Sequence, residues 1–84
     1  MVIAKSELIK SAVLFEEEVL RLGLPVCKER LKRFEKKYKM KTETFLRKFE
    51  KGMLGDKPEW FDWLFEYKAY KHLRERLGAI RQIA

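Results

Sequence analysis

Few residues of this 84-residue chain combine the type and the spacing that catalysis requires. His72 is the only histidine, and no serine, cysteine or second histidine lies at a spacing typical of a nucleophile motif. A general base needs a positioned partner, whereas the basic neighbours Lys68, Lys71 and Arg76 favour an exposed imidazole. The sequence therefore predicts no catalytic residue and a protein that is not an enzyme.

Cysteine and carboxylate chemistry is equally sparse. Cys27 is the only cysteine, which excludes a disulfide within the chain, and its place on an apolar stripe is typical of a buried, unreactive thiol. The three consecutive glutamates 16–18 point in different directions around a helix. Asp62 and Glu66 share a helix face, but a metal site needs ligands that converge from several elements, so a solvated surface is favoured. We expect no metal and no cofactor.

Basic residues are concentrated in one segment, because residues 25–41 carry a net charge of +6 out of the chain's +7. A basic helix can follow phosphates without reading base sequence, which makes nucleic acid a candidate partner. The alternative is a lysine-rich solvated surface, since the charges flank an apolar stripe on both sides. Helices over 26–39 and 42–52 could also form a helix-turn-helix, although its usual glycine is absent. The possible nucleic-acid contacts are Lys28, Lys32, Arg33, Lys36, Lys37, Lys39, Arg47, Lys48 and Lys51.

Aromatic residues crowd the first half of the last predicted helix and cover more of its circumference than one core-facing stripe. A chain of this size buries only about 60% of the surface that its unfolded form exposes. Aromatic clusters that stay exposed are typical anchors of protein interfaces, so we predict a partner-binding or self-association surface here. The alternative is a small core that the neighbouring helices close. The predicted partner-binding residues are Trp60, Phe61, Trp63, Tyr67 and Tyr70.

The elements that must position these residues are helices. A four-three-four-three spacing predicts an amphipathic helix over 6–22, with Ser6 as its N-cap. Proline cannot donate to a helix ladder, so a break or kink is predicted at Gly23-Pro25. A single long helix bent at Pro25 is the alternative, because a similar rhythm continues through it. The apolar face of the first predicted helix consists of Leu8, Ala12, Phe15, Val19 and Leu22.

Three further helices are predicted over 26–39, 42–52 and 57–80. Thr42 is the expected N-cap of the second of these, and Gly52 suits the left-handed conformation that ends it. Asp56 followed by Glu59, with Pro58 in the first turn, is a typical start of the last. The sequence thus predicts an all-α protein, a compact bundle of three or four helices in one domain over residues 1–84.

Composition sets the class of protein. Charged residues make up 39% of the chain and hydrophobic residues 46%, which is typical of a globular helical protein. The first eleven residues lack an uninterrupted apolar stretch, so we expect neither a signal peptide nor a membrane span, and a cytoplasmic location. Abundant Lys, Arg and Glu with no Asn are typical of a thermophilic source.

The stretch 42–56, followed by Trp60-Phe61-Asp62-Trp63, resembles small archaeal helical proteins that look like the antitoxins of toxin–antitoxin gene pairs. The resemblance covers residues 38–80. It implies a non-enzymatic protein that masks an RNA-cleaving or nucleotide-modifying toxin through its aromatic helix. It assigns a turn to Phe45, Phe49, Leu54, Gly55 and Asp56, and the toxin contact to Trp60, Trp63 and Tyr67. The other hypotheses are a nucleic-acid-binding protein and an accessory subunit of a larger assembly.

Overall fold

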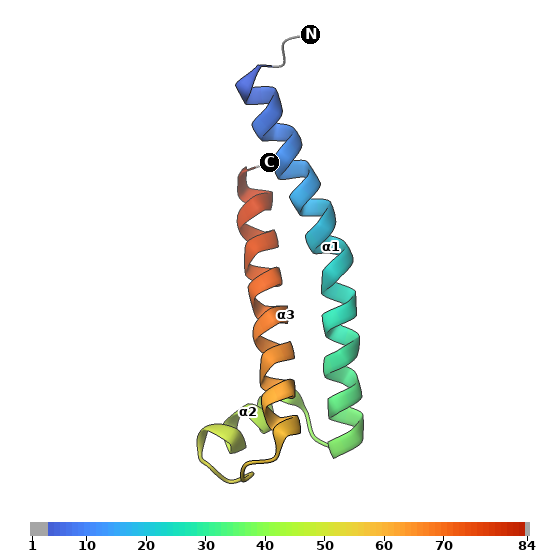
Figure 1. Ribbon diagram of the computed structural model, residues 1–84, viewed down its shortest axis with the longest axis vertical. Helices are drawn as coiled ribbons and strands as arrows, with labels where there is room; N and C mark the ends of the chain where they lie inside the picture. Colours follow the sequence, from blue (N-terminus) through green and yellow to red (C-terminus); the bar gives the residue numbers. More distant parts are fainter. Residues whose placement is uncertain (1–3, 84) are drawn as a thin grey trace.

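The computed structural model describes residues 4–83, which form α1 (Lys5–Tyr38), α2 (Thr42–Glu50) and α3 (Pro58–Ile83). Figure 1 shows α1 and α3 side by side and antiparallel, with α2 at the end where α1 stops and α3 starts. The molecule is elongated and measures 59 × 21 × 20 Å. Residues 4–83 contain three helices and no strand, so the predicted all-α helical fold is confirmed, but the molecule is elongated where a compact bundle was predicted.

The predicted break at Gly23-Pro25 is wrong, because α1 runs through Pro25 without interruption. The alternative, one long helix, is the one observed, and Figure 1 shows this helix curved. Pro25 is exposed, so the carbonyl of Arg21, which loses its helical partner at the proline, can turn to water. Across this point α1 keeps an inward stripe that packs against α3, and Leu20 and Leu31 are both buried. Packing of this face therefore outweighs the local preference of proline to end a helix.

The end of the molecule that carries α2 has an aromatic core in which all three helices meet. Its buried members are Leu31 from α1, Phe45 from α2, and Trp60 and Trp63 from α3. Half-buried side chains surround them, among them Phe34 and Tyr38 of α1. We call the five rings Phe34, Tyr38, Phe45, Trp60 and Trp63 the aromatic base.

The opposite end contains only α1 and α3, and its core is correspondingly small. Leu20 of α1 is buried with Leu77 and Ile80 of α3, and the half-buried Val13, Leu24 and Leu73 pack against them. Figure 1 shows the first turns of α1 extending past the end of α3. No third helix of residues 4–83 covers this end.

Three predicted helix starts are wrong in detail. The first helix begins at Lys5 after an extended Ala4, so Ser6 lies inside the first turn and makes no cap. The cap of α2 is Lys41, and Thr42 is its first helical residue. α3 begins at Pro58, two residues after Asp56. The spacing of apolar residues identifies the buried face of a helix, but it places the first residue only to within one or two positions.

The left-handed glycine predicted after α2 is confirmed, but the helix ends two residues before the predicted residue 52. The helix stops at Glu50, and Gly52 has the left-handed φ of 68°. The Gly52 amide donates to the carbonyl of Phe49 at 3.0 Å, and the Met53 amide donates to that of Lys48 at 3.0 Å. This pair of bonds satisfies the last carbonyls of the helix, a geometry that suits glycine.

Candidate functional site

Trp63 lies at the centre of the aromatic base and does not face a partner. Its side chain is 0% exposed, and its ring stacks on that of Phe45 with centroids 4.1 Å apart and an angle of 4°. Phe34 stacks on it at 5.5 Å. The prediction that Trp63 belongs to a partner-binding surface is therefore wrong, because rings from α1 and α2 enclose it.

The other predicted aromatic contacts are divided between core and surface. Trp60 is 7% exposed, and its indole N–H donates to the carbonyl of Leu54 at 3.0 Å, so it too is part of the core. Tyr67 and Tyr70 are half-buried against the base. Phe61 is 55% exposed and meets the ring of Phe49 edge-on. The alternative interpretation, a core closed by neighbouring helices, holds for both tryptophans.

A polar relay satisfies the buried groups of this core. The Trp63 indole N–H donates to Thr42 Oγ1 at 3.2 Å. Thr42 in turn donates to Glu35 Oε2 through its backbone N–H at 2.7 Å and through its hydroxyl at 3.0 Å. The Thr42 hydroxyl therefore bonds to a carboxylate of α1 and does not cap its own helix. Glu35 is not among the residues predicted from the sequence, since its contact with Thr42 joins two helices.

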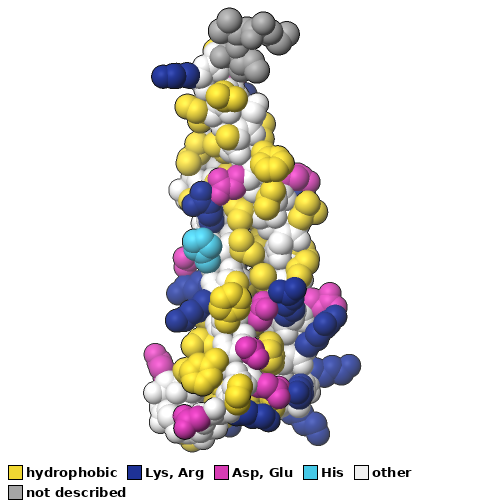
Figure 2. All heavy atoms as spheres, in the orientation of Figure 1, with side chains coloured by type: hydrophobic (Ala, Val, Ile, Leu, Met, Phe, Trp, Pro, Cys, Tyr) yellow, Lys and Arg dark blue, Asp and Glu magenta, His cyan; other side chains and the backbone are white. Residues whose placement is uncertain are grey.

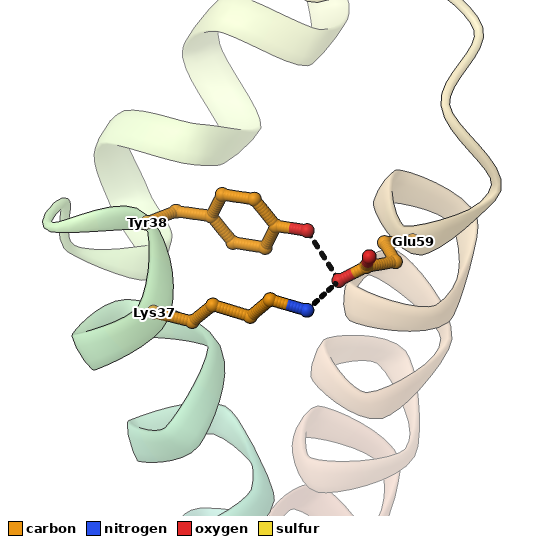
Figure 3. Close-up of polar contacts among 3 residues, drawn as sticks. All are labelled: Lys37, Tyr38 and Glu59. Carbon is orange, nitrogen blue, oxygen red and sulfur yellow. Dashed lines mark hydrogen bonds and ion pairs between the residues drawn. The ribbon is translucent and has the colours of Figure 1, made fainter.

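Glu59 links the end of α1 to the start of α3 (Figure 3). Its Oε2 accepts hydrogen bonds from Lys37 Nζ at 2.8 Å and from the hydroxyl of Tyr38. The bond from Lys37, followed by that from Tyr38, holds the pKa of Glu59 below its ordinary value. The hydrogen bond to Glu59 and the negative charge of Glu59 raise the pKa of Lys37. The predicted capping bond to the Asp56 region is replaced by this ion pair. This ion pair links the two helices but is partly exposed, so it contributes little to stability.

The predicted nucleic-acid contacts are all exposed, on the C-terminal half of α1 and on or next to α2. Two of them are already paired, Arg33 with Glu29 at 3.3 Å and Lys37 with Glu59 at 2.8 Å. Lys28, Lys32 and Lys36 follow at intervals of four and make no ion pair among residues 4–83. The basic segment therefore retains cationic side chains that phosphates could bind.

A basic groove, absent from the sequence-based predictions, lies between α1 and α3 beside Pro25. It has a volume of about 680 Å³ and carries no carboxylate in its lining. Arg81 reaches Glu17 at 3.7 Å, and Arg74 lies over the ring of Tyr70 at 5.8 Å. Local spacing does not reveal the groove, because half of its charges come from α3, about fifty residues away along the chain. Its four cationic residues are Arg21, Lys28, Arg74 and Arg81.

The apolar face predicted for the first helix has the expected spacing, but its large side chains are exposed. Phe15 is 72% exposed, Leu22 is 67% exposed and Leu8 is 59% exposed. The next position of the same pattern, Val26, is 49% exposed. We call this face the α1 seam, and it consists of Leu8, Ala12, Phe15, Val19, Leu22 and Val26.

The seam is exposed because α3 packs on a different stripe of α1. The residues of α1 that contact α3 include Val13, Leu20 and Leu24, which begin a second apolar rhythm. The two stripes diverge by about a third of a turn of the helix, so one partner helix cannot cover both. Figure 2 shows hydrophobic side chains gathered over the half of the molecule that lies away from α2, with most charged side chains in the other half.

The arrangement of the remaining polar residues offers little chemistry. Cys27 is buried, as predicted, and His72 is exposed. Glu16 pairs with Arg76, which lowers the pKa of Glu16 and raises that of Arg76 through their hydrogen bond. Within residues 4–83, no three His, Cys, Asp or Glu side chains are grouped as a metal site. No helix in that range is long and apolar enough to span a bilayer.

Comparison of the chain with protein-family models, with curated proteins and with solved structures found no match. The exposure of the α1 seam and the cationic lining of the basic groove make these two surfaces the candidates for function.

Proposed function

We propose that this chain is a protein-binding module without catalytic activity, and that its interface is the α1 seam. The observation that carries the proposal is the seam itself, in which Leu8, Phe15 and Leu22 are each more than half exposed. A contiguous apolar patch of this kind is costly in water and marks a surface that another protein covers.

The size and shape of the chain support the same proposal. Its accessible surface is 6958 Å², whereas a compact monomer of this mass would expose about 5,300 Å². Its radius of gyration is 17.5 Å, against about 12 Å for a compact domain of this length. The excess surface exceeds the roughly 800 Å² that each partner contributes to a standard interface.

An antitoxin-like role is the specific form of this function that the resemblance implies. With Trp60 and Trp63 inside the core, the toxin contact would have to move from α3 to the α1 seam. The chemistry of the seam suits an apolar helix of the toxin, which would complete the two-helix end as α2 completes the other.

Phe15→Glu, compared with Phe65→Glu, tests the proposal. The two phenylalanines are 72% and 70% exposed, but only Phe15 lies on the seam. We expect Phe15→Glu to abolish association with the natural binding partner, because it places a charge in an apolar interface, while Phe65→Glu retains it. The measurement is affinity capture from the cells that make the protein, followed by titration of the purified partner. Equal retention by both variants would rule the seam out.

A second function, binding of nucleic acid, is favoured by the basic groove. Four cationic side chains meet there, of which Arg21 and Arg81 also pair with Glu18 and Glu17 outside the lining, and Lys32 and Lys36 extend the basic surface along α1. Such a surface can neutralise several phosphates of one backbone.

Fluorescence anisotropy with duplex DNA and with RNA tests this second function. Phosphate-driven binding should fall about 10³-fold or more between 50 and 200 mM salt if six or more phosphates are contacted. Arg74→Glu with Arg81→Glu should weaken it further, whereas Arg47→Glu with Lys48→Glu, on α2, serves as the charge-matched control. Binding that survives high salt, or that depends on the α2 pair alone, would contradict a role for the groove.

A further inference from the structure

We infer that the occupant of the α1 seam is a second copy of this chain, packed antiparallel about a two-fold axis near residue 17. The inference rests on the proposed function and names a second copy, in place of a toxin helix, as the partner of the same surface. Three features of α1 carry it: the register of the apolar residues, the charges at the two ends of the seam, and the available area.

The register of the seam suits antiparallel pairing of two identical helices. Its intervals of four, three, four, three and four read the same in both directions. When two copies are paired about residue 17, Phe15 faces the partner's Val19, Ala12 faces the partner's Leu22 and Leu8 faces the partner's Val26. Each large side chain then lies opposite a smaller one, which favours close packing of the two helices.

The charges at the ends of the seam select the direction. The next positions of the same heptad are Lys5 before Leu8 and Glu29 after Val26. In the antiparallel register Lys5 lies opposite the partner's Glu29, and the two-fold axis repeats this pair at the other end. In a parallel register lysine would face lysine and glutamate would face glutamate, which is unfavourable.

The acidic residues beside the axis are held by arginines of their own chain. Glu16 pairs with Arg76 of α3, and Glu18 lies 4.0 Å from Arg21. Phe15 and Val19, in the middle of the seam, therefore lie next to glutamates whose negative charge is balanced by an arginine. Two copies can therefore approach there with less repulsion than the glutamates alone would cause.

The area is sufficient for a stable dimer. The segment from Lys5 to Glu29 is about 37 Å long as a helix, and its exposed hydrophobic side chains lie along the seam between flanking charged residues. Pairing would join the two-helix ends of both copies into one four-helix arrangement. The apolar residues of α1 that α3 does not cover would then be buried in its core. The basic groove lies on another side of α1 and stays accessible.

Cross-linking through single cysteines tests the direction and register. In a Cys27→Ala background, Ala12→Cys and Leu22→Cys are made as separate proteins, oxidised alone and after mixing. We expect disulfide dimers only in the mixture, because residue 12 faces the partner's residue 22 and never its own equivalent. Dimers from each protein alone would overturn the antiparallel direction, and no dimer in the mixture would overturn the inference.

Charge exchange sharpens the test. Lys5→Glu and Glu29→Lys should each raise the dimer dissociation constant about two- to tenfold, and the double variant should restore it. A double variant that is weaker than either single variant would contradict the pairing of residues 5 and 29. Exchange of Lys10 with Glu7, off the seam, is the control and should leave the constant unchanged.

Sedimentation equilibrium separates failure of this inference from failure of the proposed function. We expect the wild-type chain and Phe65→Glu to have twice the monomer mass of 10.2 kDa, and Phe15→Glu to have the monomer mass. A monomeric wild type whose capture of a different protein is lost in Phe15→Glu would overturn the second copy but leave the seam as the interface. A Phe15→Glu variant that still forms dimers and still captures every partner would overturn both.

Discussion

The two ends of this molecule differ in how many helices close them. At the aromatic base, α2 joins α1 and α3, and the two largest fully buried side chains, Trp63 and Phe45, lie there. At the opposite end α1 meets α3 alone, and Phe15 and Leu22 of the seam stay open to water. The same long helix therefore has a closed core at one end and an unfinished one at the other. A third element decides whether an apolar helix face becomes core or interface.

The difference also separates stability from function. A small domain derives most of its stability from the side chains that it buries completely, and these gather at the base. Side chains of the seam contribute little to the monomer, because folding leaves them in water. Substitutions at the base should therefore unfold the chain, and substitutions on the seam should change only what it binds.

The largest effect is expected for Trp63→Ala. The substitution removes the ring that Phe34 and Phe45 enclose and leaves a cavity, so it should cost about 3–5 kcal/mol of unfolding free energy. A chain of this length has about 4–13 kcal/mol in total, so the variant should lose a large part of its stability. Chemical denaturation followed by circular dichroism measures this. A cost below about 1 kcal/mol would show that the base is not the core of the fold.

A smaller effect is expected for Thr42→Val. The change leaves the buried Trp63 N–H without its acceptor and removes the hydroxyl that donates to Glu35, which should cost about 1–3 kcal/mol. Thr44→Val, on the same helix and half-buried, is the control and should cost less than about 0.5 kcal/mol. If both variants lose the same stability, the relay is unimportant and only helix propensity is affected.

A modest pH effect is expected from Glu59. Its pKa is lowered in the folded chain, so its contribution is complete above about pH 4.3, the ordinary value for glutamate, and is lost as the pH falls through the lowered pKa. Glu59→Gln should flatten the fall of the melting temperature in that acidic range. Glu50→Gln, at an exposed position outside the ion pairs of residues 4–83, should leave the profile unchanged. Identical profiles for all three proteins would contradict this account.

The smallest effect is expected for Phe15→Ala. Its ring is 72% exposed, so its removal from the dilute monomer should change the unfolding free energy by less than about 0.5 kcal/mol. Thermal unfolding at low and at high protein concentration measures this, and the loss should appear only at the concentration at which the seam is covered. A large loss in the dilute monomer would mean that the seam belongs to the core of a single chain.

The sequence was sufficient for the fold class and for most of the face of α3 that is buried. Trp60, Trp63, Leu77 and Ile80 follow one helical stripe, and all four are buried, although the two tryptophans were assigned to a partner-binding surface. The start of α2 at Thr42 and the glycine that ends it were close to their observed places. These features depend on local spacing and on backbone conformation, which a sequence carries directly.

Which apolar surface stays exposed could not be predicted. The face over Leu8 to Leu22 and the aromatic face of α3 look equally amphipathic, and only the position of α2 decides that the second is enclosed. The break predicted at Pro25 failed for a similar reason, since packing along α1 offsets the local cost of a proline inside the helix. Contacts between different helices, such as that of Glu35 with Thr42, produce no periodic pattern in the sequence.

Oxidative labelling of Phe15 and Phe65 in the cells that make the protein tests the central claim most directly. The two rings have nearly the same exposure in the single chain, so in dilute purified protein they should react at similar rates, while Trp63 stays protected. Inside the cells we expect Phe15 to react several-fold more slowly than Phe65, because a protein covers the α1 seam. Equal reaction of the two phenylalanines there would show that the seam remains open and would contradict the account.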